Sequence, residues 1–208
     1  MKTIVFDFNG TILDDVDLSL KCLNGIVKKY GVRDALNLDE YREVFDFPVI
    51  DYYRNVGFDF SKASFEEVGS QWMEYYNEAK NEYRVMEGAI ETLIKSKAYG
   101  NTNVLISASK HDNLLAQCEE LELMPYFDEI IGIDNIYAPG KIDIVKEFMK
   151  DKDPNNVIFI GDTLHDAEVA KSVGAKCYLV ANGHQSYKRL LKANVPVYKD
   201  IREVPICE

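Results

Sequence analysis

An aspartate near the end of an apolar run is the most informative residue for chemistry in this sequence. Asp7 lies in the run 3–8, and the turn sequence Asn9-Gly10-Thr11 follows it. A glycine turn lets backbone amides approach an anion closely. A carboxylate at this point could bind a metal ion, or it could attack phosphorus and form an aspartyl-phosphate. Asp7 is therefore the first candidate for a catalytic group.

Two further aspartates follow a second apolar run. The run 157–160 leads into Asp162, and Asp166 comes four residues later. Two hard oxygen ligands near a third carboxylate suit Mg²⁺, which binds few protein ligands and keeps several waters. The sequence therefore predicts a magnesium site, provided that the two runs end at the same place in the fold.

The apolar runs predict a scaffold that would bring these segments together. Five short runs are typical of buried parallel strands: 3–8, 103–107, 129–133, 157–160 and 176–180. Helical patterns follow the later runs, near 111–121, 141–150 and 164–173. This alternation predicts right-handed βαβ units and a doubly wound, Rossmann-like α/β fold with a five-stranded parallel sheet. In such sheets, ligands bind at the carboxyl ends of the strands.

The segment between the first two predicted strands is far longer than a crossover requires. Apolar residues recur at helical spacing over 16–30 and over 65–83, and Pro48 suits the first turn of a short helix between them. These patterns predict an inserted bundle of helices. We therefore expect a core made of residues 1–14 and 84–208 and a helical insert made of residues 15–83.

Composition and charge exclude several classes of partner. Of the 208 residues, 47% are apolar and 28% are charged, as in ordinary globular proteins. The net charge of −11 argues against binding to nucleic acid or to an anionic membrane surface. No apolar stretch approaches the length that spans a bilayer, and the four cysteines have no metal-type spacing. We expect a cytoplasmic protein with reduced thiols and with no nucleic-acid or membrane partner.

The candidate segments together resemble the four motifs of the haloacid dehalogenase-like superfamily, in its phosphoglycolate phosphatase/β-phosphoglucomutase-like group with a helical cap. The matching segments, in chain order, are Asp7-Phe8-Asn9-Gly10-Thr11, Ser107 after Val104-Leu105-Ile106, Lys141 after Pro139-Gly140, and Asp162 with Asp166. No single motif is decisive, but four in this order are highly specific. The resemblance covers nearly the whole chain and is weakest in the insert, which it identifies as a cap that closes over the active site.

The resemblance implies a role for each matching residue. Asp7 would be the nucleophile, and the catalytic set would be completed by Asn9, Ser107 and Lys141. The phosphoryl group would be held by Asn9, Gly10, Ser107, Ala108 and Lys141. The cofactor Mg²⁺ would be bound by Asp7, the backbone carbonyl of Asn9, Asp162 and Asp166. The substrate would be a small phosphorylated metabolite, and the protein would be a monomer or a weak dimer.

Asn9 departs from the family pattern, because phosphatases of this family usually carry a second aspartate there. That aspartate protonates the leaving alcohol and then activates the attacking water, and an amide can do neither. General acid–base catalysis typically contributes about 10²–10⁴-fold. Two histidines that follow predicted strands, His165 first and His184 second, are candidates to replace the missing group, because histidine titrates near neutrality.

The sequence therefore predicts a Mg²⁺-dependent hydrolase of a small phosphomonoester, acting through an aspartyl-phosphate and weakened by Asn9. Two alternatives stay open. One is a non-catalytic module that kept the phosphate pocket and uses it for binding or regulation. The other is a relative that cleaves phosphonates or carbon–halogen bonds.

Overall fold

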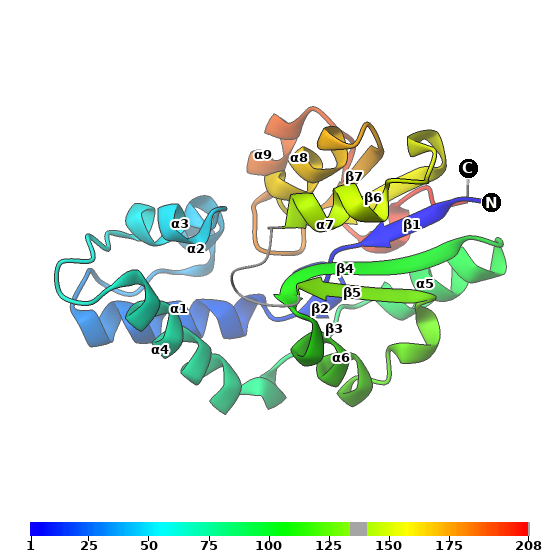
Figure 1. Cartoon of the computed structure of the whole chain (residues 1–208). Helices are drawn as coiled ribbons and strands as arrows, with labels where there is room; N and C mark the ends of the chain where they lie inside the picture. The colour runs from blue at the N-terminus through cyan, green and yellow to red at the C-terminus, as the bar shows by residue number, and fades with distance from the viewer. Residues whose placement is uncertain (134–140, 208) are drawn as a thin grey trace.

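The computed structural model describes residues 1–133 and 141–207, and a parallel sheet lies at its centre (Figure 1). Six strands within the described residues form this sheet, in the order β5-β4-β1-β6-β7-β8. Their bounds are β1 Thr3–Phe6, β4 Thr102–Lys110, β5 Glu129–Ile133, β6 Val157–Gly161, β7 Lys176–Val180 and β8 Val197–Tyr198. The five predicted strands are present. The sixth, β8, has two residues, which is too short to produce an apolar pattern in the sequence.

Strand β1 lies between β4 and β6 in the middle of the sheet. Phe6 pairs with Leu105 of β4 on one side and with Ile160 of β6 on the other. Residues that directly follow these three strands therefore meet at one edge of the sheet. This register explains how segments more than 150 positions apart in the chain can build one site.

Helices cover both faces of the sheet, as the doubly wound prediction requires (Figure 1). Their bounds are α5 Ala89–Ala98, α6 His111–Glu120, α7 Lys141–Phe148, α8 Leu164–Ser172 and α9 Tyr187–Leu190. Successive residues of β1 point to opposite faces. Phe6 packs in a core with Leu93 of α5, whereas Val5 packs in a second core with Val169 of α8. Five short 3₁₀ helices also occur in the part of the chain that the structure describes: η1 Lys80–Glu82, η2 Met124–Tyr126, η3 Pro154–Asn156, η4 Leu191–Ala193 and η5 Ile201–Glu203.

The long insert forms a bundle beside the sheet, with a hydrophobic core of its own (Figure 1). Its helices are α1 Val16–Tyr30, α2 Leu38–Val44, α3 Val49–Val56 and α4 Phe65–Glu78. Gly31 ends α1 in the left-handed conformation, with φ of 61°. Helix α2 was not expected from the apolar pattern, although Asn37 and Glu40 form a capping box at its start.

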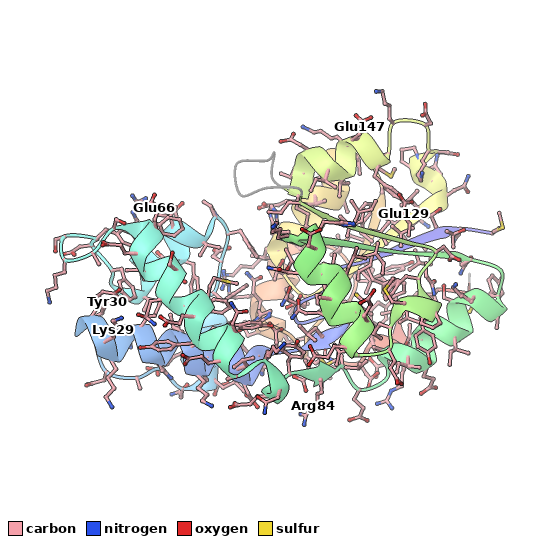
Figure 2. The ribbon with its side chains drawn as sticks, turned by 60° about the horizontal axis from the view of Figure 1, so that its bottom comes forward. Lys29, Tyr30, Glu66, Arg84, Glu129 and Glu147 are labelled. Carbon is pink, nitrogen blue, oxygen red and sulfur yellow. The ribbon has the colours of Figure 1, made fainter. Side chains whose placement is uncertain are left out.

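Two short strands join the bundle to the sheet domain. β2 (Leu13–Asp14) and β3 (Arg84–Val85) pair antiparallel, so the chain enters and leaves the insert at the same place. Figure 2 shows Arg84 close to this junction, with Lys29, Tyr30 and Glu66 at the far end of the bundle. Among the described helices, none is long and apolar enough to cross a membrane.

Candidate active site

The structure brings Asp7, Asp162 and Asp166 together at the carboxyl edge of the sheet. One carboxylate oxygen from each lies within 4.8 Å of the others. The backbone amide of Asp7 donates to the carbonyl of Ile160 at 2.9 Å, which holds Asp7 against the end of β6. Three hard oxygen donors at this spacing fit a divalent cation such as Mg²⁺.

Lys141 is buried among these carboxylates. Its ammonium group contacts Asp7 and lies 2.7 Å from Oδ1 of Asp166. Three carboxylates against one ammonium group leave an excess of negative charge when all are ionised, and a bound cation would offset it. The lysine predicted at the start of a helix is thus in contact with two of the three predicted metal ligands.

Burial sets the protonation of the cluster. It raises the pKa of Asp7 to about 7 even though Lys141 opposes the shift, and it raises the pKa of Asp162 to about 6. Burial also acts to raise the pKa of Asp166, but Lys141 and the hydroxyl of Thr163 outweigh it, so that this pKa is lowered. The cluster therefore holds protons near neutrality that a metal ion would displace.

Local structure orients the two later aspartates. Asp166 is the third residue of α8 and forms a capping box with Thr163, whose hydroxyl donates to Asp166 Oδ2 at 2.7 Å. Asp162 accepts from the backbone amide of His184 at 2.6 Å and from the hydroxyl of Thr11 at 3.1 Å. Each carboxylate is thus directed by hydrogen bonds before any metal binds.

Apart from Lys141, the predicted phosphate-binding residues lie on two neighbouring segments. Ser107 is buried in β4, and its hydroxyl accepts from the amide of Ser109 at 3.1 Å. Ala108 between them is exposed, and the hydroxyl of Ser109 donates to Asn9 Oδ1 at 3.4 Å. Gly10 has a positive φ of 75°, as the predicted turn requires. Pro139 and Gly140, which precede Lys141, lie outside the described residues.

The three histidines occupy different positions. His184 is buried, with Nε2 3.2 Å from Asp15 and Nδ1 2.8 Å from the hydroxyl of Tyr41. His165 is partly exposed, with Nδ1 3.6 Å from Glu168. His111 begins α6, and its ring accepts from the amide of Gly132 at 3.3 Å. Both ring nitrogens of His184 are therefore engaged within the protein.

Sequence reasoning missed Asp15, which lies in direct contact with the predicted site. The carboxylate is buried and accepts from the side-chain amide of Asn9 at 2.8 Å and from the backbone amide of Gly10 at 3.2 Å. An aspartate before a helix is ordinarily explained as a cap. No pattern in the sequence therefore distinguished Asp15 from a capping residue.

The sheet is doubly wound, carries an acidic cluster and a buried lysine at its carboxyl edge, and lies beside an inserted helical bundle. This combination of fold and site is that of a hydrolase of the haloacid dehalogenase type. The family model described as haloacid dehalogenase-like hydrolase matches residues 4–180. The chain belongs to this family.

Known proteins similar to this chain cover nearly all of it. Phosphoglycolate phosphatase 1 of Pseudomonas aeruginosa is 22% identical to this chain, and the match covers 99% of this chain and 79% of the length of that phosphatase. A protein of Caldanaerobacter subterraneus with the provisional name pyrophosphatase PpaX is 23% identical over 95% of this chain and 89% of its own. A haloacid dehalogenase-like hydrolase of Streptococcus pneumoniae has the same fold, with a TM-score of 0.82 and 21% identity over 98% of this chain and 96% of that one.

Proposed function

We propose that this chain is a Mg²⁺-dependent phosphatase that hydrolyses a small phosphomonoester through an aspartyl-phosphate on Asp7. The observation that carries the proposal is the position of Asp7, whose carboxylate contacts Lys141 and lies within 4.8 Å of the carboxylates of Asp162 and Asp166. Phosphoryl transfer depends mainly on positioning and on charge stabilisation, and this cluster is suited to supply both.

Each residue of the site has a role in this mechanism. Asp7 attacks phosphorus in line, and a water then hydrolyses the aspartyl-phosphate. Lys141 and bound Mg²⁺ would neutralise charge on the transferring group. Asp7, Asp162, Asp166 and the backbone carbonyl of Asn9 would hold the metal. The phosphoryl oxygens would be held by Ser107 and by the backbone amides of Asn9 and Ala108. The amide of Gly10, which the sequence also predicted for this role, already donates to Asp15 and to the carbonyl of Leu13.

The helical insert acts as a cap in this proposal. Its helix α2 touches the core beside the site, through Tyr41 and His184. A closed cap excludes bulk water and favours substrates small enough to be enclosed. The relatives named as a phosphoglycolate phosphatase and a pyrophosphatase are consistent with a small phosphorylated substrate. The insert boundaries at 15 and 83, the cytoplasmic location and the monomeric or weakly dimeric state stay predictions.

The absence of a carboxylate at position 9 determines which substrates should be hydrolysed slowly. An amide cannot protonate a leaving alcohol, so esters of poor leaving groups should react slowly. The replacement of this group by His165 or His184 stays a prediction. The same amide favours a second candidate function, a non-catalytic phosphate-binding module that retains the metal site.

Hydrolysis of p-nitrophenyl phosphate separates the two functions. Its leaving group departs without a proton, so the unmodified protein should turn it over in Mg²⁺. Asp7→Asn should abolish turnover, because an amide is not a nucleophile here. Phosphate and Mg²⁺ binding without Asp7-dependent turnover would support the binding module. Inactivity on this ester together with turnover of a phosphonate or a haloacid would replace the phosphatase assignment.

A further inference from the structure

Asp15 is a buried carboxylate that the proposed mechanism does not use. It is 2% exposed, and it lies between the turn at Asn9 and the first helix of the insert. Five donors surround its two oxygens. Oδ1 accepts from Gly10 N and His184 Nε2, both at 3.2 Å, and Oδ2 accepts from Asn9 Nδ2 at 2.8 Å, Tyr76 Oη at 3.0 Å and Ser19 Oγ at 3.4 Å.

The position of Asp15 in the chain makes this arrangement unusual. Asp15 is the N-cap residue of α1, yet its side chain accepts no capping hydrogen bond from that helix. Losing an N-cap typically weakens a helix. The carboxylate is instead directed toward Asn9 and His184, which indicates that it serves the site and not the helix.

An ionised carboxylate determines which way the neighbouring amide points. A carboxylate only accepts hydrogen bonds, so Asn9 must present its NH₂ group to Asp15. The carbonyl oxygen Oδ1 of Asn9 then faces the opposite way, where Ser109 of β4 donates to it at 3.4 Å. Burial opposes ionisation of Asp15, but His184 and the surrounding donors lower its pKa below the usual value.

We propose that Asp15 is a positioning residue that holds the amide of Asn9 with its carbonyl oxygen toward the phosphoryl site, and that position 9 is an amide because position 15 is a carboxylate. In the proposed phosphatase reaction, on which this assignment rests, Asn9 Oδ1 accepts a hydrogen bond from the attacking water and orients it. It transfers no proton.

The contacts explain why a carboxylate does not fit at position 9 alone. Asn9→Asp would place two carboxylates about 2.8 Å apart in a partly buried position, because the present contact between these two side chains has that length. The reciprocal change removes the conflict. In Asn9→Asp/Asp15→Asn, the new amide at 15 donates to the new carboxylate at 9 and still accepts from Gly10 and His184. The hydroxyls of Ser19 and Tyr76 can accept as well as donate.

The single change Asp15→Asn should turn the amide of Asn9. Two NH₂ groups cannot face each other, so Asn9 would direct its oxygen toward position 15 and its NH₂ group toward the phosphoryl site. We expect kcat to fall on the order of tenfold with KM little changed, because the interaction lost is one made to the reacting groups. If Asp15 had a purely structural role, Asp15→Asn would lower stability without this selective fall in kcat.

The experiment is a double-mutant cycle on the full chain, read first as melting temperature at pH 8 without substrate. Asn9→Asp and Asp15→Asn should each lower the melting temperature, the former by about 10 °C. The double variant should melt higher than Asn9→Asp and should regain kcat relative to Asp15→Asn. Additive losses in melting temperature would overturn the pairing.

Asp14 provides the matched control. It is the adjacent carboxylate, but its side chain pairs with Arg84 at 2.9 Å, across the β2–β3 pair. Asn9→Asp/Asp14→Asn should therefore not recover the loss caused by Asn9→Asp, and equal recovery would overturn the proposal. The melting-temperature cycle needs no turnover, so it tests the pairing even if the phosphatase assignment fails. If the unmodified protein turned over p-nitrophenyl phosphate but the losses in melting temperature were additive, the pairing of Asp15 with Asn9 would be rejected and the phosphatase assignment would stand.

Discussion

Individual glycines allow the carboxylates of the site to pack closely. A Cβ atom on Gly161 would lie 2.2 Å from Cγ of Asp166, and one on Gly183 would lie 2.2 Å from Oδ2 of Asp162. Both distances are far below van der Waals contact. The positions of the Asp162 and Asp166 carboxylates therefore depend on Gly183 and Gly161, because a side chain at either glycine would overlap the neighbouring carboxylate.

Gly161→Ala should displace the carboxylate of Asp166 from Lys141 and from the proposed metal site. We expect Mg²⁺ affinity to fall at least about tenfold and the free energy of unfolding to fall by about 1–3 kcal/mol, the usual range for overpacking. Isothermal titration with Mg²⁺ and urea unfolding would measure both effects.

Gly69→Ala in α4 is the matched control, because a Cβ atom there meets nothing within 4 Å. It should stabilise the helix by about 0.5–1 kcal/mol and leave Mg²⁺ binding unchanged. Unaltered Mg²⁺ affinity in Gly161→Ala would show that this close packing does not determine the metal site.

At the scale of elements, the end of α2 is attached to the segment that follows β7. Arg42 donates to the carbonyls of Gly183 and Asn182, at 3.0 and 3.3 Å. In the opposite direction, the buried Arg189 of α9 donates to the carbonyl of Arg42 at 3.1 Å and to Asp46 at 2.9 Å. A cation at the carboxyl end of a helix satisfies carbonyls that lack partners within the helix. The contact thus holds the insert against the core beside His184.

Arg189→Ala should loosen the contact between α2 and the core. Hydrogen bonds to a charged group contribute about 1.5–3 kcal/mol each, so we expect a loss of about 2 kcal/mol in urea unfolding. Amide hydrogen exchange should rise in α2, because its last carbonyls lose their donor.

Lys188→Ala is the control for this variant, since Lys188 is the exposed neighbour in the same short helix. It should change neither stability nor exchange by a measurable amount. Unchanged exchange in α2 of Arg189→Ala would mean that other contacts hold this helix in place.

For the whole molecule, the raised pKa values of Asp7 and Asp162, about 7 and about 6, imply an inverse dependence of stability on pH without metal. A raised pKa means that the folded state binds protons which the unfolded state, with the ordinary value of 3.8, has released. This contribution to stability is present at low pH and is lost as pH rises through 6 and 7. The raised pKa of His184, which burial opposes and Asp15 causes, acts in the same direction.

The metal-free protein should therefore lose stability between pH 6 and pH 8, and Mg²⁺ should stabilise it more at pH 8 than at pH 6. Saturation at 100 times the dissociation constant contributes about 2.7 kcal/mol. Thermal unfolding in EDTA and in Mg²⁺ at both pH values would measure this. Asp7→Asn should flatten the metal-free pH dependence, and a slope equal to that of the unmodified protein would contradict the assignment of these protons to the cluster.

The sequence predicted most of the sheet and missed several elements for identifiable reasons. Strands buried on both faces produce continuous apolar runs, so β1, β4 and β6 were recognisable. β5 and β7 are less buried, but each still carries a short apolar run. Helix α2 has only one buried residue, Tyr41, and therefore no clear apolar stripe. The sequence indicated Asp7, Asp162, Asp166 and Lys141 as candidate site residues because they belong to motifs at the ends of strands or the start of a helix, and the structure brings these four side chains together.

The sequence by itself determined the class of fold and the cluster of acids, because parallel strands that share a sheet must end at a common edge. Only the tertiary structure decided what surrounds Asn9. The contacts of Asp15 with Asn9, Tyr76 and His184 depend on how the insert approaches the core. The orientation of an amide depends on its nearest partner in space, and no spacing along the chain encodes that partner.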